Sequence, residues 1–409
     1  MSVVFDTKKI KKDFPIFENN PELVYLDNAA TSQTPRQVLA AMEKYYTCYR
    51  SNIHRGGYGI AEMATERFEN ARQTLANFIG AQASEVVFTS GSTAGMNMLV
   101  AGLAEYLDIG SGDTIVSTMM EHHSSYLPLW NLARKNGAKL VRIGVMKDFG
   151  LDYEEAKRVI TDGVKIVSIV LVSNVLGTIN DVRLIADLAH RVGAIMIVDA
   201  TEAVGHIPVN VRELACDFLV FSGHKMCGPT GIGVLYGKRD LLAKLEPNIM
   251  GGGIVESVGE SDVVWREPPQ RFEPGTQNIA GAIGLAAAAE YLTAIGVESI
   301  HEYVRGLLLY AVEEIERVLG VTIVGKRNPR ENGGIIAFSV DDIHPHDIAE
   351  IVGRNGIALR AGYHCAEPLV KSLSLPAVTR ASLYLYNDKT DLDILTASVR
   401  EAVNFFSKR

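Results

Sequence analysis

Short apolar runs that end in polar turns recur through the middle of the chain and most constrain its fold. Near-continuous runs of strand length occur at 86–88, 164–172, 194–198 and 218–221, and helical patterns separate several of them. Strands that alternate with helices form a mostly parallel sheet with helices on both faces. Ligands of such sheets bind at the carboxyl ends of the strands. The sequence therefore predicts an α/β protein whose site lies in the turns that follow these runs.

Two of the runs end in residues suited to pyridoxal phosphate (PLP). The run at 194–198 ends on Asp199, and the run at 218–221 ends in a Ser-Gly-His-Lys turn that contains Lys225. A lysine amine condenses with an aldehyde to form a Schiff base, and an acidic partner at the pyridine nitrogen keeps the cofactor ring an electron sink. Taken alone, Lys225 is equally explained as a surface lysine and Asp199 as a helix cap. Together, at neighbouring strand ends, they predict a PLP site.

The loop after the run at 86–88 is suited to a phosphate group. It reads Thr-Ser-Gly-Ser-Thr-Ala-Gly at 89–95, directly before a helical pattern at 96–106. A helix N-terminus that follows a strand binds phosphate through backbone amides. The loop lacks the lysine and the glycine spacing of nucleotide-binding loops. By itself it is better explained as a Ser/Thr-rich helix cap.

Two adjacent histidines, His122 and His123, follow the strand predicted at 114–118. Because neighbouring residues of a strand face opposite ways, we expect only one of them to enter a site. The four cysteines are widely scattered and show no paired metal spacing. We therefore predict no metal site.

Composition limits the partners and suggests two domains. A chain of 409 residues exceeds what one core usually supports, and we predict a larger domain at 21–275 and a smaller α/β domain from 1–20 and 276–409. The net charge of −8 argues against binding of nucleic acid or an anionic membrane. No run reaches the ~20 apolar residues of a membrane span, and the first residues lack a signal-peptide pattern. With unpaired cysteines, this predicts a cytoplasmic protein.

Eight segments in one order resemble those of the group II cysteine desulfurases, the subgroup that includes the selenocysteine lyases. The resemblance extends from about residue 10 to the C-terminus. It implies fold type I of the PLP enzymes, with a large domain on a mostly parallel seven-stranded sheet, a smaller C-terminal α/β domain, and a homodimer with shared active sites. The segments are LDNAA at 26–30, NIHRG at 52–56, MEHH at 120–123, SNVLG at 173–177, SGHK at 222–225, RFEPGT at 271–276, RAGYHCA at 360–366 and RAS at 380–382.

The resemblance also implies roles for individual residues. Lys225 would hold PLP and move a proton, and Asp199 would face the pyridine nitrogen. His122 would stack on the cofactor ring and assist proton transfer as a catalytic residue. Arg380 would clamp the substrate carboxylate as a bidentate partner. The remaining cofactor contacts would come from Ser92, Thr93, Asn174, Ser222, His224 and Thr276, and the remaining substrate contacts from Ala30, His54, Arg55, Asn174 and Arg360, with Thr276 and Arg55 supplied by the partner subunit.

Cys365 decides the substrate class. In the family this cysteine takes sulfur from L-cysteine, leaving L-alanine and a persulfide for a sulfur-acceptor protein of iron–sulfur cluster or related assembly. The step needs a thiolate, and we expect His364, Arg360 and a cationic pocket to lower the pKa of the Cys365 thiol. The alternative is a buried, inert thiol.

Other functions stay open beside cysteine desulfuration. An aminotransferase or epimerase would need no thiol at this position, whereas a selenocysteine lyase would share every residue. A non-catalytic scaffold with a PLP fold would not need Lys225, Asp199 and Arg380 together.

Glu202 departs from the family pattern. The family usually has a Gln three residues after the aspartate, which donates a hydrogen bond to the ring oxygen of PLP. Like charge and burial both raise the pKa of a carboxyl group above about 4.3. We expect Glu202 to carry a proton near neutral pH and to take the role of the Gln. The alternative is an ionised carboxylate that turns away from the ring.

Overall fold

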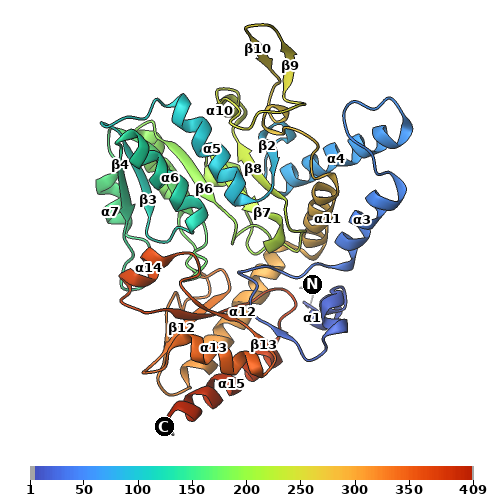
Figure 1. The fold of residues 1–409 in the computed structure, drawn as a ribbon. Coiled ribbons are helices and arrows are strands. Elements are labelled where there is room, and N and C mark those ends of the chain that lie inside the picture. The colour runs from blue at the N-terminus through green and yellow to red at the C-terminus, as the bar shows by residue number, and fades with distance from the viewer. Residues whose placement is uncertain (1–4, 408–409) are drawn as a thin grey trace.

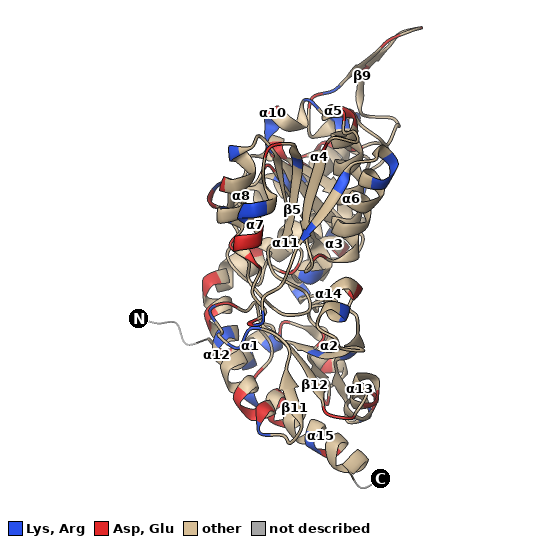
Figure 2. Cartoon of the chain, turned by 90° about the vertical axis from the view of Figure 1, so that its left-hand side faces the viewer, with Lys and Arg blue, Asp and Glu red and all other residues tan. Residues whose placement is uncertain are grey.

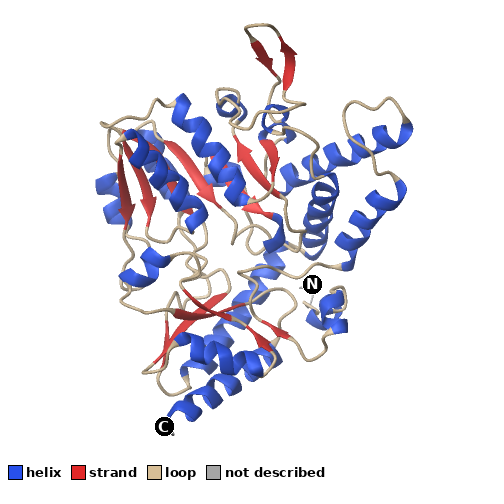
Figure 3. Ribbon diagram, viewed as in Figure 1, coloured by secondary structure: helices blue, strands red, loops and turns tan. Residues whose placement is uncertain are grey.

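The computed structural model describes residues 5–407 as two packed α/β parts, each built on a sheet (Figure 1, Figure 3). The larger part contains a seven-stranded sheet in the order β2-β8-β7-β6-β5-β3-β4. All neighbours are parallel except β8, which is antiparallel to β2 and β7. The predicted α/β class with a mostly parallel seven-stranded sheet is confirmed. The strands are β2 (Val86–Thr89), β3 (Thr114–Thr118), β4 (Lys139–Ile143), β5 (Val164–Val170), β6 (Ile195–Asp199), β7 (Phe218–Ser222) and β8 (Gly233–Gly237).

Both faces of this sheet are covered, which explains why its central strands are mostly apolar. In β7, Leu219 and Phe221 pack into a core with helices of one layer, whereas Phe218 and Val220 pack into a second core on the other face. The first layer contains α3 (Arg36–Cys48), α4 (Gly59–Phe78), α8 (Val182–Arg191) and α11 (Ile279–Ile295), and the second contains α5 (Ser92–Tyr106) and α6 (His123–Asn136). Shorter helices at the edges are α7 (Tyr153–Val159), α9 (Val211–Leu214) and α10 (Arg239–Leu242).

The smaller part has a four-stranded antiparallel sheet in the order β11-β12-β15-β14. The Arg-Ala-Ser segment at 380–382 forms the last three residues of β15, which ends at Ser382. The strands are β11 (Val321–Ile323), β12 (Ile335–Val340), β14 (Arg360–Gly362) and β15 (Val378–Ser382), and the helices are α1 (Thr7–Lys11), α2 (Pro15–Asn19), α12 (Val297–Glu316), α13 (Pro345–Arg354), α14 (Glu367–Ser372) and α15 (Lys389–Ser407).

Two segments pack across the predicted domain borders. β1 (Val24–Tyr25) belongs to the predicted larger domain but pairs in parallel with β13 (Ile357–Ala358) of the smaller part. Helix α11 belongs to the predicted smaller domain but packs against α3 and α4. Its Ala- and Gly-rich sequence is buried on nearly all sides, as is typical of a helix without a polar face. The domain borders at residues 21 and 275 stay a prediction, and β1 and α11 are the two segments that pack across them.

A hairpin of β9 (Val255–Val258) and β10 (Val263–Trp265) projects from the larger part (Figure 2). Val258, Val263 and Val264 on it are exposed. Within residues 5–407, no single helix is long and apolar enough to cross a membrane; α11 and α12 reach that length and apolarity only as a pair, and they are bent by 71°.

Candidate active site

A cavity of about 250 Å³ lies where the two parts meet, at the carboxyl ends of β5, β6 and β7. Parallel strands present their following turns at one edge. Ala29, Ala30 and residues of the strands β14 and β15 close the other side. Most of the predicted site residues line this cavity. They are Ala30, Ser92, Thr93, His122, Asn174, Asp199, Glu202, Ser222, His224, Lys225, Arg360, Cys365 and Arg380.

Three predicted site residues do not reach this cavity. His54, Arg55 and Thr276 line a separate cavity together with the glycines at 252, 253 and 275. Within one chain, these residues and Lys225 therefore belong to different places. Arg55 and Thr276 were predicted to reach the site of the partner subunit, and their separation from Lys225 within one chain is consistent with that prediction.

Lys225 ends a single 3-10 turn, Gly223–Lys225, that directly follows β7. The turn is tight, because a Cβ atom at Gly228 would lie 2.8 Å from the carbonyl oxygen of Gly223. His206 Nε2 donates to the Lys225 carbonyl oxygen at 2.9 Å. These contacts fix the backbone from which the Lys225 side chain enters the cavity.

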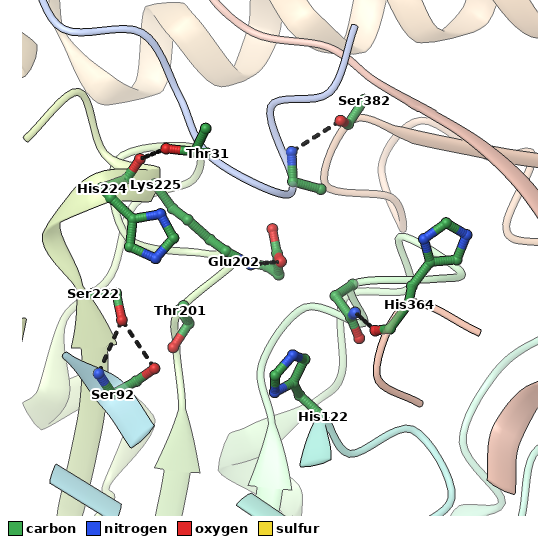
Figure 4. A network of polar contacts seen from close by, with 12 residues as sticks. Thr31, Ser92, His122, Thr201, Glu202, Ser222, His224, Lys225, His364 and Ser382 are labelled. Carbon is green, nitrogen blue, oxygen red and sulfur yellow. Dashed lines mark hydrogen bonds and ion pairs between the residues drawn. The ribbon is translucent and has the colours of Figure 1, made fainter. Parts of the chain in front are cut away.

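Glu202 does not turn away from the cavity. Its Oε1 forms a short ion pair with Lys225 Nζ, and both side chains are buried (Figure 4). A buried ion pair satisfies two charges that would each be costly alone. That Glu202 donates a proton to the cofactor stays a prediction.

Asp199 is held as a hydrogen-bond acceptor at the end of β6. Ser125 Oγ donates to its Oδ2 at 2.6 Å. Thr201 donates to its Oδ1 from the backbone nitrogen at 3.0 Å and from Oγ1 at 2.5 Å. Ser125 was not predicted from the sequence. The signal that could have identified it is its position soon after the histidine pair, in the first turn of α6.

The phosphate loop becomes the first turn of α5, which starts at Ser92 rather than at the predicted residue 96. Gly91 allows this early start, since its φ of 142° lies in a region that favours glycine. Ser222 Oγ accepts from Ser92 N at 2.9 Å and donates to Ser92 Oγ at 2.9 Å (Figure 4). Ser92 and Thr93 thus present a helix N-terminus to the cavity, which favours an anion.

His122 lines the cavity, whereas His123 is the first residue of α6. The reason is helix capping, not the strand alternation that we expected. His122 Nδ1 accepts from Ser124 N at 3.1 Å and contacts Ser124 Oγ at 2.8 Å. Burial lowers the pKa of His122, so the neutral ring carries its proton on Nε2.

Cys365 is exposed at the cavity, in a loop where both His364 and Cys365 have positive φ. The His364 carbonyl accepts from Asn174 Nδ2 at 2.6 Å, and its ring Nε2 donates to the Val378 carbonyl at 3.1 Å. The ring points away from His122 and Lys225 (Figure 4). Burial, with Arg380 nearby, lowers the pKa of His364 to about 3. The expectation that His364 supplies positive charge to Cys365 is therefore wrong, because the ring is buried and neutral.

Arg380 is fully buried and only partly paired. Its Nη1 donates to the Asn174 carbonyl at 2.7 Å, while its Nε has no hydrogen-bond partner within residues 5–407. An unpartnered donor of a buried cation is costly. Arg380 therefore has a free donor, and Asn174 Oδ1 beside it is also without a partner in the described chain.

These groups fit PLP by their chemistry. Lys225 offers an amine for the aldehyde, Asp199 a carboxylate for the pyridine nitrogen, and the α5 N-terminus with Ser222 and His224 a cradle for the phosphate. Within residues 5–407, no group of three or more His, Cys, Asp or Glu side chains is placed to hold a metal ion.

Comparison with known proteins gives a consistent result. The family model for aminotransferase class V matches residues 24–395. The chain is 45% identical to a probable cysteine desulfurase of Halalkalibacterium halodurans, over 97% of this chain and 98% of that protein. It is 44% identical to a probable cysteine desulfurase of Streptomyces coelicolor, over 98% of each.

Solved structures agree with the sequence relatives. The apo structure of a cysteine desulfurase from Thermococcus onnurineus NA1 superimposes with a TM-score of 0.94 at 40% identity, covering 99% of this chain and 100% of that one. The cysteine desulfurase CsdA of Escherichia coli superimposes with a TM-score of 0.91 at 33% identity, covering 98% and 100%.

Glu121, next to His122, is a buried acid that sequence reasoning missed. Its Oε1 accepts from Thr118 Oγ1 at 2.7 Å and from Val170 N at 2.9 Å, which ties the loop before α6 to the end of β5. Its Oε2 has no partner among the described residues. Burial raises the pKa of Glu121 to about 8, so the side chain is neutral at pH 7.

Replacing Glu121 by Gln tests this buried acid. The pKa of Glu121 is higher in the folded protein than in the unfolded chain. Its side chain therefore contributes fully to stability below the unfolded pKa of about 4.3, and this contribution is lost as the pH rises to about 8. Glu121→Gln stays neutral, so its Tm relative to wild type should rise steadily from about pH 5 to about pH 8 and level off above. Thermal unfolding across this range measures the difference. A difference that does not change with pH would contradict a neutral Glu121.

Proposed function

The chain belongs to the cysteine desulfurases of the class V aminotransferase family, and we propose that it uses PLP to convert L-cysteine to L-alanine and holds the sulfur as a persulfide on Cys365. The observation that carries the proposal is one cavity that combines Lys225, Asp199 and Arg380 with an exposed Cys365. An aminotransferase needs no thiol there. A selenocysteine lyase would use the same residues, and no observation favours it.

Bound PLP supplies an electron sink that withdraws electrons from the substrate Cα. Lys225 would hold its aldehyde, Asp199 its pyridine nitrogen and His122 its ring face. Ser92, Thr93, Ser222 and His224 would hold its phosphate. The Lys225 amine, when free, is also the group within the cavity that is suited to carry a proton to and from carbon.

Arg380 would bind the substrate carboxylate with its unpartnered Nε–H. The thiolate of Cys365 would attack the substrate sulfur, so that a sulfur–sulfur bond forms as the carbon–sulfur bond breaks. The carbon product takes up a proton and leaves as L-alanine. The exposure of Cys365 supports transfer of the sulfur to an acceptor protein, for which we propose a component of iron–sulfur cluster or related assembly.

A homodimer would complete the site. His54, Arg55 and Thr276 lie in their own cavity, near no other predicted catalytic group. Exposed apolar side chains on α3, α4 and the loop between them, among them Leu39, Tyr46 and Tyr58, support an interface between subunits. The unpaired cysteines support a reducing cytoplasm as the place of action.

Lys225→Ala should abolish covalent attachment of PLP and catalysis together, because Lys225 is the only amine among the described residues that line the cavity. Borohydride reduction followed by peptide mapping should locate the cofactor on Lys225 in the wild type. Lys238→Ala, which removes a lysine paired with Asp217, is the matched control and should keep both properties. A label on another lysine would refute the assignment.

Cys365→Ser should bind PLP and L-cysteine as the wild type does but release little sulfide, since a serine oxygen cannot hold a sulfane sulfur. Sulfide release in the presence of a reductant measures the effect, and we expect a loss of at least about 100-fold. Cys48→Ser removes the other exposed thiol and should leave release unchanged. Normal release by the Cys365 variant would favour another PLP chemistry.

Mixing two inactive variants tests the shared site. If Arg55 serves the partner's cavity, a hybrid of Lys225→Ala and Arg55→Ala subunits has one intact site and one doubly defective site. An equal mixture should then regain about a quarter of wild-type sulfide release after subunit exchange. Light scattering should give the mass of a dimer. No recovery in an exchanging mixture would place Arg55 outside the partner's site.

A further inference from the structure

The separate cavity that contains Arg55 and Thr276 combines exposed groups with a buried acid. Its volume is about 210 Å³, and most of its lining residues come from two segments, 52–55 and 270–277. Arg55 and Thr276 are exposed, whereas Glu273 is buried. The contacts of Glu273 therefore decide how firmly this part of the cavity is held.

Arg72 on α4 is the partner of that acid, and it is itself fully buried. Its Nη1 donates to Glu273 Oε1 at 2.6 Å and its Nη2 to Glu273 Oε2 at 2.9 Å, which makes a bidentate pair. Nε and Nη2 also donate to the carboxylate of Glu69 at 2.9 and 3.2 Å, and Nη1 donates to the Val86 carbonyl at 2.9 Å. These hydrogen bonds hold the guanidinium in one orientation.

Glu273 fixes the loop that presents Thr276. Its Oε1 also accepts from Phe88 N at 2.7 Å, so the carboxylate is bound to α4 and to β2 at once. Gln277 Nε2 donates to the Glu273 carbonyl at 2.6 Å, which closes the turn between the two residues. Thr276 lies within this closed turn. Its exposed hydroxyl group is thus held at a position that buried contacts determine.

Glu69 connects Arg72 to the segment that contains Arg55. Its Oε1 lies 3.5 Å from His54 Nε2, and Thr65 Oγ1 on α4 accepts from His54 N at 2.9 Å. His54 has a positive φ of 70°, which is uncommon for a residue with a side chain and persists where the surroundings hold it. The same guanidinium therefore joins both segments of the cavity.

We propose that Arg72 and Glu273 are a positioning pair, which holds Thr276 and Arg55 in place to bind the cofactor phosphate in the site of the partner subunit. The inference rests on the proposed function, because it takes the site as shared between two subunits. Groups on a rigid base lose little freedom when they bind a ligand. Exposed groups on a buried, fully hydrogen-bonded base are therefore suited to bind a ligand outside their own chain.

Hybrid dimers with one intact Lys225 test the inference, because only that site gives the absorbance of covalently bound PLP. Two subunits with different affinity tags are purified together, and cofactor occupancy is measured at a series of free PLP concentrations. In the trans hybrid, a wild-type subunit is paired with a subunit that carries Lys225→Ala and Glu273→Gln. In the cis hybrid, a Glu273→Gln subunit is paired with a Lys225→Ala subunit.

The two hybrids should differ in their affinity for PLP. The trans hybrid should bind PLP about tenfold more weakly than a reference hybrid of wild type and Lys225→Ala, because the altered loop reaches the intact Lys225 site. The cis hybrid should bind within about twofold of the reference, since its intact site receives Thr276 from a subunit with an unaltered pair. A pair that only stabilised its own chain would not produce this difference.

Two further variants control for folding. Glu85→Gln removes the charge of a buried carboxylate that directly precedes β2 and pairs with Arg212, and it should leave PLP affinity unchanged in both hybrids. Glu69→Gln alters a side chain that is 36% exposed, against 3% for Glu273, so it gives an answer even where Glu273→Gln does not fold. It should weaken PLP binding about threefold in the trans hybrid alone.

Equal losses of affinity in the cis and trans hybrids would overturn the inference, because they would indicate a structural role alone. A trans hybrid that binds PLP as tightly as the reference would overturn it as well. Thr276→Ala in the trans hybrid separates the inference from the proposed function and should weaken PLP binding. If Thr276→Ala has this effect and Glu273→Gln does not, the inference alone fails. If Thr276→Ala has no effect, the shared site of the proposed function fails.

Discussion

The parallel pairing of β5, β6 and β7 places the residues that follow these strands side by side, and the rest of the site depends on it. Val170 is the register partner of Asp199, and Asp199 is the partner of Val220, two residues before the Ser222 turn. An apolar core on each face holds this register. The polar groups at the strand ends are therefore fixed by packing that involves none of them. Their own hydrogen bonds, such as Ser125 to Asp199, then set only the local orientation.

The second half of the site comes from the smaller part, and the segment 24–31 links the two. β1 pairs with β13, Asp27 bridges to Ser382, and Thr31 Oγ1 donates to the His224 carbonyl at 3.0 Å. One short segment thus touches both the strand of Arg380 and the turn of Lys225. Movement of either part would change the distance between the amine and the guanidinium groups. The predicted domain border at residue 21 therefore assigns the segment 24–31 to the larger domain, although this segment packs with the smaller part as well.

Prediction from the sequence succeeded where a local pattern is compatible with only one kind of structure. Apolar runs predicted the central strands, and the polar turns predicted that Lys225, Asp199 and the hydroxyls near Ser92 would meet at one edge. It failed where burial decides. His364 was expected to be a cation near Cys365, yet its ring is buried against Val378 and neutral. His122 enters the cavity as a helix cap, although strand alternation was the expected cause.

The sequence by itself determined the fold class, the family resemblance and the chemical groups available, because these depend on periodicity and on residue types in order. Only the tertiary structure decided which groups pair. Asp27 lies more than 330 residues from Arg360 in the chain and contacts it directly, and Glu202 contacts Lys225 across a cavity that both line. His54, Arg55 and Thr276 were placed apart from that cavity by the same packing. Pairings of this kind depend on which side chains share a face and on how deeply they are buried. The local sequence determines neither of these properties, because both arise from contacts between distant segments.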